Sequence, residues 1–408
     1  MPDTALVAVI EPIETLTKRP RTYGLWFVQE AYHREKWEAL GLDVTQRDET
    51  PIAIDLGAGP VNVRRDISKL TIGPDGGYPV AVDATADFPA LPEFPALTEI
   101  VYEGGDAGLV GYLERQAVQN LTWSSHAQTH IDLSGSLLSR LTIEVTEPLR
   151  LRVPPQLDWL IVDGDASLLT VENVDARWPF ELTVRHSLIT SPPAGLETVQ
   201  SLTLDRLVES DTAGLTGYTD LRSLTLRGAP GRLTDVAGVV EQASLRELWV
   251  FDLYGLDGGS WQREDGWPML DDVLITGLHK DDARSIKAAL VTVPRVKISG
   301  SRSDAWIAAN LDNPLRDWDN DGAAFGKAAR NAWKKAKIAT QKLGVVGAAP
   351  EAMAALEAFV VALNRLADKY DIDTMRREEA FEAYLGLAGD FGVTVDEASE
   401  AFDQWRNF

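Results

Sequence analysis

The chain repeats one short pattern, apolar-x-x-apolar-x-apolar, eleven times through its middle. From Leu121 onward, successive middle residues are separated by 20, 19, 22, 20, 22, 24, 25 and 23 residues. Each interval has room for one strand, a turn, a returning segment and a second turn, and such a unit can bury its apolar side only against its neighbours. The spacing therefore predicts stacked repeats. Their middle residues are Leu70, Ile100, Leu121, Leu141, Leu160, Leu182, Leu202, Leu224, Leu248, Val273 and Val296.

Within each repeat, the apolar residues alternate as a strand requires. Leu224 and Leu226 fall on one face of such a strand, and Thr225 falls on the other. This pattern resembles the leucine-rich repeat family over residues 67–301. The resemblance implies an α/β fold, a leucine-rich-repeat solenoid whose strands form a curved parallel sheet and whose concave face binds other macromolecules.

The repeats are irregular in two respects. Where the family usually has an Asn or Cys in the turn, several later repeats have an apolar residue instead, as at Leu207, Leu253 and Leu278. The returning segments also change along the chain. They are strand-like at 131–133, 149–153, 168–171 and 188–190, whereas 234–242 and 281–290 have the apolar spacing of short helices.

The sequence on either side of the repeats predicts two further domains. Residues 1–66 contain a strand-like segment, Leu6–Ile10, and a helical one, Leu25–Leu40, which we interpret as an N-terminal cap over the first repeat. Residues 302–408 are expected to form an α-helical bundle, with helices at 323–343, 350–370, 374–388 and 394–405. Within this part, residues 313–319 are similar to a stretch in uncharacterised actinobacterial repeat proteins labelled gliding-motility proteins, a label that implies no mechanism.

Composition narrows the functional classes. The 408 residues carry a formal net charge of -23, which argues against binding to nucleic acid or anionic lipid, because both require clustered Lys and Arg. The chain has no cysteine, so disulfides, thiolate catalysis and the common structural zinc sites are excluded. Its start lacks a basic leader with a long apolar run, and no later stretch approaches the length of a membrane helix. We therefore expect a cytoplasmic protein.

Two short motifs invite a chemical interpretation. Residues 54–60 resemble the glycine-rich turn of S-adenosylmethionine-dependent methyltransferases, but no third glycine or helix follows, so a tight turn in the cap is expected and no cofactor. Asp317, Asp319 and Asp321, followed by Gly322, copy the first half of a calcium loop. Position twelve is Ala328, which cannot supply the closing carboxylate, and an acidic turn at the start of a helix explains the same residues. No pair of carboxylates stands out as catalytic, so an enzyme is not expected.

The side chains between the buried residues form the face that could bind a partner. Most of the expected central row is threonine, which suits a solvated sheet, but Trp249 and Leu274 are large and apolar. Aromatic rings bordered by Arg are typical of interface hot spots. The alternative is that the C-terminal helices cover these residues as internal packing, and the sequence leaves both interpretations open. The central row is Thr71, Val101, Thr122, Thr142, Ile161, Thr183, Thr203, Thr225, Trp249, Leu274 and Lys297.

These observations favour a non-enzymatic scaffold that binds a protein partner on the concave face. A calcium-responsive module centred on the loop 317–322 is the alternative hypothesis. The proposed contact residues are Trp159, Arg185, Arg222, Arg227, Arg246, Trp249, Phe251 and Lys297.

Overall fold

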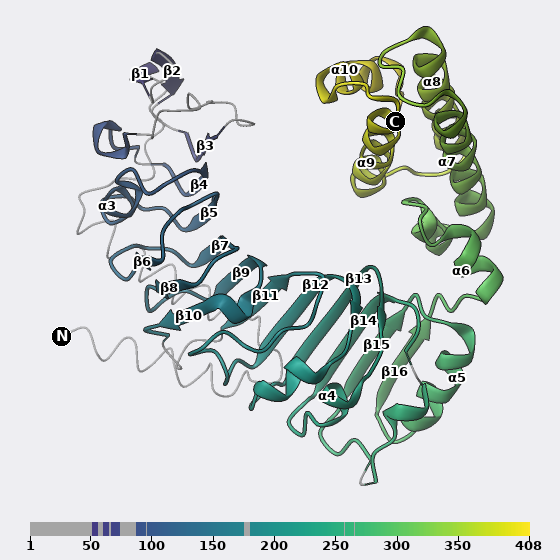
Figure 1. Ribbon diagram of the computed structural model, residues 1–408, viewed down its shortest axis with the longest axis horizontal. Coiled ribbons are helices and arrows are strands. Elements are labelled where there is room, and N and C mark those ends of the chain that lie inside the picture. Colours follow the sequence, from purple (N-terminus) through teal and green to yellow (C-terminus); the bar gives the residue numbers. More distant parts are fainter. Residues whose placement is uncertain are drawn as a thin grey trace. The chain divides into compact units, whose positions relative to one another are not determined.

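The computed structural model describes residues 51–55, 60–64, 67–73, 87–94, 96–174, 180–256, 258–264 and 266–408. It is a mixed α/β structure that divides into two compact units, Met1–Ser299 and Gly300–Phe408 (Figure 1). The first unit contains a large parallel sheet, and the second is built from helices. The division falls two residues before the predicted start of the helical domain at 302.

Eleven parallel strands form the large sheet, and each one pairs with the next along the sheet. The register places every triplet beside its equivalent in the neighbouring strand, as with Leu182, Leu202 and Leu224. The stacking of the triplets that the sequence predicts is thereby confirmed. The strands are β3 (Lys69–Ile72), β4 (Glu99–Glu103), β5 (Asn120–Ser124), β7 (Arg140–Val145), β9 (Trp159–Gly164), β11 (Glu181–Arg185), β12 (Ser201–Ser210), β13 (Ser223–Leu233), β14 (Glu247–Leu253), β15 (Asp272–Thr276) and β16 (Arg295–Ser299).

The core of this unit lies against one face of the sheet. In the strands β3 to β15, both strand residues of each triplet are buried, and together they form one continuous apolar cluster. Full burial of a Leu or Val side chain stabilises a fold by about 1.5–3 kcal/mol, so the regular triplets provide much of its stability. In the last strand, Val296 and Ile298 are only partly buried. The apolar turn residues Leu207, Leu253 and Leu278 are also buried, so apolar side chains suit these turns.

The returning segments behave largely as predicted. β6 (His130–Asp132), β8 (Leu149–Arg152) and β10 (Leu169–Glu172) form a second parallel sheet, in the order β10-β8-β6. Residues 188–190 do not form a strand, so that prediction is wrong, and only the bridge from Thr170 to Ala194 extends the pairing. Further along the chain, helices take the place of these strands. α4 (Ala237–Val240) lies inside the predicted range 234–242, and α5 (Lys280–Ala289) begins and ends one residue before the predicted range 281–290.

Shorter elements complete the first unit. They are α3 (Leu109–Leu113) and four 3-10 turns, η1 (Phe88–Ala90), η2 (Ala166–Leu168), η3 (Ala213–Gly217) and η4 (Gly258–Trp261). β1 (Pro51–Asp55) and β2 (Pro60–Arg64) form an antiparallel hairpin, so a strand and not a helix follows the glycine-rich turn. This agrees with the turn interpretation. Residues 56–59 of that turn, and the predicted cap elements Leu6–Ile10 and Leu25–Leu40, lie outside the described residues.

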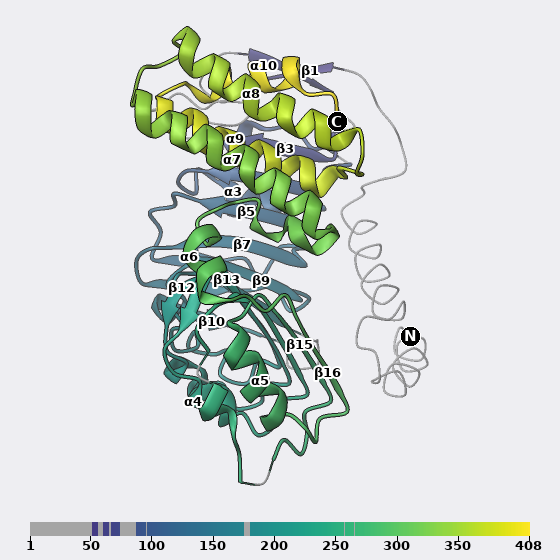
Figure 2. The same ribbon diagram turned by 90° about the vertical axis from the view of Figure 1, so that its right-hand side faces the viewer.

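Four long helices of the second unit pack around their own apolar core (Figure 2). They are α7 (Ala323–Leu343), α8 (Pro350–Ala367), α9 (Thr374–Phe391) and α10 (Val395–Trp405), close to the predicted ranges. A short helix, α6 (Asp304–Asn310), and the turn η5 (Arg316–Asp321) precede them. Pro350 starts α8, and Thr394 and Glu397 form a capping box on α10, in which each side chain satisfies a backbone N–H at the helix start.

Candidate functional site

The face of the large sheet opposite its core carries three rows of side chains, which we call the open face. The predicted central row is confirmed by the strand pairing, which sets Thr225 beside Trp249, Trp249 beside Leu274, and Leu274 beside Lys297. Because side chains alternate along a strand, the residues two places before and two places after each central residue lie on the same face. Trp159 belongs to the row before, and Arg185, Arg227 and Phe251 belong to the row after.

From β7 to β12, the larger side chains of the open face already bind one another. The Trp159 indole N–H donates a hydrogen bond to Thr183 Oγ1 at 3.1 Å, and the Arg140 guanidinium lies 4.0 Å from the centre of the same indole. Arg185 lies between Asp163 and Asp205, at 3.4 and 4.0 Å, one on each neighbouring strand. Trp159 and Arg185, two of the predicted contact residues, are therefore held by neighbours within the sheet.

The strands β13 to β16 present a different surface. Trp249 is 40% exposed in the central row of β14, although a large indole usually buries most of its area. Phe251, two residues further on, is partly buried, and the Arg227 guanidinium from β13 lies 5.1 Å from the centre of its ring. Leu274 on β15 continues this surface as the cross-strand neighbour of Trp249. We call Arg227, Trp249, Phe251 and Leu274 the aromatic patch.

The charges around the aromatic patch are unbalanced. Asp272 pairs with Arg295 at 3.5 Å, whereas Glu247 accepts a hydrogen bond only from the neutral Ser223 Oγ, at 3.3 Å, among the described residues. Lys297, in contrast, is exposed and has no ion pair or side-chain hydrogen bond with any described residue. A chain with 62 acidic and 39 basic residues thus leaves a cation without a partner two strands from Trp249.

Arg222 and Arg246 do not belong to the rows of the open face. β13 begins at Ser223 and β14 at Glu247, so each arginine lies one residue before its strand. Both are exposed, and Arg222 lies 3.4 Å from Asp220. Arg246 has no side-chain partner in the described ranges. These two predicted contact residues therefore lie just before the start of their strands, outside the three rows of the open face.

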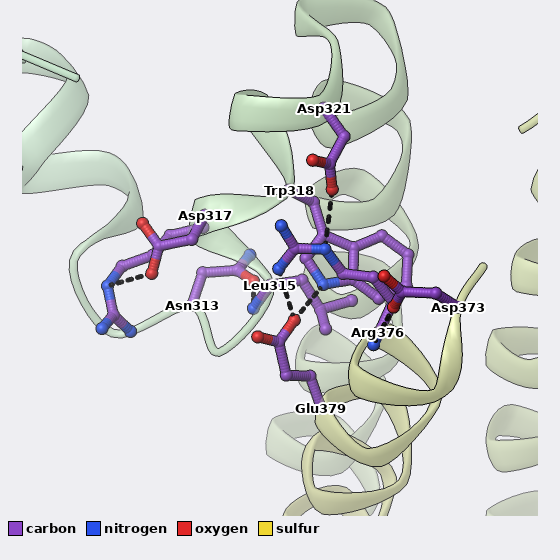
Figure 3. Close-up of polar contacts among 9 residues, drawn as sticks. Asn313, Leu315, Asp317, Trp318, Asp321, Asp373, Arg376 and Glu379 are labelled. Atoms are coloured by element: carbon purple, nitrogen blue, oxygen red, sulfur yellow. Dashed lines mark hydrogen bonds and ion pairs between the residues drawn. The ribbon is translucent and has the colours of Figure 1, made fainter. Parts of the chain in front are cut away.

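The acidic loop of the second unit does not gather its carboxylates. Asp321 accepts a hydrogen bond from Arg376 at 2.7 Å, Asp319 binds Arg330 and also Arg302 at 3.5 Å, and Asp317 lies 3.7 Å from Arg316. Figure 3 shows the Asp317 and Asp321 carboxylates apart from each other, with Asp321 bonded to Arg376. In the described part of the chain, no three His, Asp or Glu side chains come close enough to hold a metal ion. This arrangement does not favour the calcium hypothesis.

The same loop does not cap a helix with its side chains either. The N-cap of α7 is Gly322, and no acidic side chain lies in the first turn. The loop instead organises the core of the second unit, because the buried Trp318 stacks on Phe325 at a ring distance of 4.9 Å and donates to Glu379 at 2.8 Å. No side-chain hydrogen bond caps α7, and the expected interaction of these carboxylates with the helix dipole stays a prediction.

Arg376 joins this loop to α9, a role that sequence reasoning missed. Burial works to lower its pKa, but the hydrogen bonds to Asp321 and Glu379 outweigh that effect and raise the pKa. The bond to Glu379 is 2.7 Å long, so one arginine binds two carboxylates (Figure 3). Arg376 lies 55 residues after Asp321, and no spacing rule connects residues so far apart.

No family model matches the chain, and neither a curated protein nor a solved structure gives a match. None of the helices in the described ranges has both the length and the apolar character needed to cross a membrane.

Proposed function

We propose that the first unit is an irregular solenoid of the leucine-rich repeat type, and that the chain is a non-enzymatic scaffold. Support for the solenoid comes from eleven parallel strands in chain order, whose middle residues are 19 to 30 residues apart. In this proposal the open face is the concave face of the solenoid. The absence of cysteine supports a reducing, cytoplasmic location.

The proposed activity is the binding of a protein partner through the aromatic patch. The observation that carries this proposal is the exposed Trp249, next to Phe251 under Arg227. A rigid ring buries a large area for little loss of side-chain entropy, and Trp and Arg are enriched among residues that dominate binding energy. Among the described residues, Trp249 has no hydrogen bond and no cation above its ring, whereas the similar Trp159 is held by Arg140 and Thr183.

The charges indicate the kind of partner. Lys297 lies two strands from Trp249 without a partner among the described residues, and Arg227 lies over Phe251, while Asp272 is paired with Arg295. Complementary charge increases association rates and disfavours wrong partners. A protein segment with apolar side chains and acidic neighbours fits this surface. Nucleic acid fits poorly, because the net charge of -23 opposes phosphate.

Affinity capture from the native cell lysate, followed by binding measurements with the purified partner, tests the proposal. Trp249→Ala and Phe251→Ala should each weaken binding at least thirtyfold, which corresponds to about 2 kcal/mol at a hot spot. Thr122→Ala, in the same row on β5, is the matched control and should bind normally. Thermal unfolding of each variant decides between the two sequence interpretations, because a large loss of stability in Trp249→Ala would show that this ring serves internal packing.

A further inference from the structure

A second apolar surface lies in the helical unit, in an open groove between α7 and α8. The groove has a volume of about 600 Å³ and is lined mainly by alanine side chains. Ala328, Ala332, Ala336 and Ala339 follow one another along α7 at intervals of four, four and three residues, which places them on one side of the helix. Ala355 and Ala358 lie on the α8 side.

The length of the groove matches a helical segment. Ala328 and Ala339 are eleven residues apart, which at 1.5 Å per residue is about 16 Å, or three helical turns. Ala332 and Ala336 are buried, whereas Ala328 and Ala339 are partly exposed and Ala358 is exposed, so a third helix would contact the exposed methyl groups. A helix whose apolar face lies in a groove is a common mode of peptide recognition.

Two cations border this groove without partners. Lys335 on α7 and Arg365 on α8 both line it, both are exposed, and neither has an ion pair or side-chain hydrogen bond with a described residue. α7 also differs in charge from the rest of its unit, because it contains six basic residues and no acidic one. The basic residues of α7 are Lys327, Arg330, Lys334, Lys335, Lys337 and Lys342.

We propose that the α7–α8 groove binds an acidic amphipathic helix of a partner protein. Its apolar side chains would lie over the alanines, and its carboxylates would lie beside Lys335 and Arg365. The apolar lining disfavours nucleic acid, whose phosphates need polar donors. The concave form disfavours a lipid surface, which binds a protruding apolar face. This surface is separate from the aromatic patch, so the proposal does not depend on that function.

A displayed library of amphipathic helical peptides, with variable residues flanking the apolar face, tests this proposal on the full chain. Selected peptides should be rich in Asp and Glu. Ala358→Glu places a carboxylate in the groove and should weaken their binding at least tenfold. Ala354→Glu is the matched control, since Ala354 is exposed one turn earlier on α8 and does not line the groove. Circular dichroism shows whether both variants keep their helices.

Each outcome decides the proposal. Acidic binders that lose affinity in Ala358→Glu and in Lys335→Glu, but not in Ala354→Glu, support it. A library without enriched binders, binders without acidic residues, or equal binding to Ala358→Glu and Ala354→Glu would overturn it. Sedimentation with phosphatidylserine vesicles is the second arm, and vesicle binding that Ala358→Glu abolishes would assign the groove to a membrane instead. Trp249→Ala should leave peptide binding unchanged, which separates this site from the aromatic patch.

Discussion

The helical unit and the open face of the sheet use charged side chains in opposite ways. In the helical unit, Arg376 is 7% exposed and bonds Asp321 and Glu379 at 2.7 Å each. On the open face, the Arg185 side chain is 32% exposed and lies 3.4 and 4.0 Å from two aspartates. Each arginine serves two partly exposed carboxylates, and the main difference between the clusters is the burial of the guanidinium, because the Arg376 side chain is 9% exposed.

This difference separates charges that the fold requires from charges it tolerates. Removing one partner of a buried ion pair leaves a charge with neither water nor a partner, whereas exposed pairs are screened and contribute little. Three cationic side chains belong neither to the cluster around Arg376 nor to the one around Arg185. Lys297, Lys335 and Arg365 are exposed without partners in the described chain, and their positions beside apolar surfaces indicate binding. Replacing residues of each kind should therefore give a graded series of effects on stability.

The largest effect is expected from Arg376→Leu. Asp321 and Glu379 would lose their shared cation, but both carboxylates keep contact with water, so the free energy of unfolding of the helical unit should fall by about 3 kcal/mol. Urea unfolding followed by circular dichroism at 222 nm measures this loss. Arg377→Leu is the matched control. Arg377 is the next residue on α9, and unlike Arg376 it has no ion pair in the described structure. Equal losses in the two variants would show that the ion pairs of Arg376 are not what stabilises the unit.

A smaller effect is expected from Trp159→Ala. This change removes the ring beneath Arg140 and the hydrogen bond to Thr183, and should lower the free energy of unfolding by about 2 kcal/mol. Trp249→Ala, which removes a more exposed ring of the same type, should cost less than about 1 kcal/mol. Both variants replace a tryptophan by alanine, so the difference between them reports only on the surroundings of the two rings. A reversed order would mean that the aromatic patch is the more tightly packed surface.

The third effect is smaller still. Arg185→Ala should lower the free energy of unfolding by about 0.5 kcal/mol, the range measured for exposed ion pairs. The loss should shrink in 1 M salt, where the Debye length is only about 3 Å. Arg206→Ala provides a comparison, because Arg206 also binds Asp163, at 3.1 Å, and is 61% exposed. A loss above about 2 kcal/mol in Arg185→Ala would mean that the ion pairs of Arg185 with Asp163 and Asp205 stabilise the fold as much as those of Arg376 do.

The sequence predicted the regular parts of the fold well because they repeat. The apolar residues within every triplet have the same spacing. Aligning the triplets therefore gave the register of the open face, including the row through Thr225, Trp249 and Leu274. The helices of the second unit followed from periodic apolar residues and caps such as Thr394. The strand predicted at residues 188–190 is absent, because apolar and β-branched residues also occur in irregular returning segments.

The polar clusters could not be predicted in the same way. Asp321 meets Arg376 across 55 residues, and Arg206 reaches Asp163 across 43. Such pairs depend on how elements pack, which no local pattern encodes. The loop 317–322 therefore had the composition of half a calcium site, yet its carboxylates are divided among arginines from other segments. For the same reason, whether Trp249 or Trp159 had a covering partner could not be read from the sequence.

The smallest effect on stability is expected from Lys297→Gln. Lys297 is exposed and has no partner in the described chain, so the free energy of unfolding should change by less than about 0.5 kcal/mol. Its effect should appear in binding: association with the captured partner should slow, and the slowing should vanish at high salt. Arg295→Gln is the control, because Arg295 lies on the same strand and face but pairs with Asp272. If Arg295→Gln slowed association as much as Lys297→Gln, general charge would explain the effect. A difference between them would show that a cation without a partner in the fold acts on the partner protein.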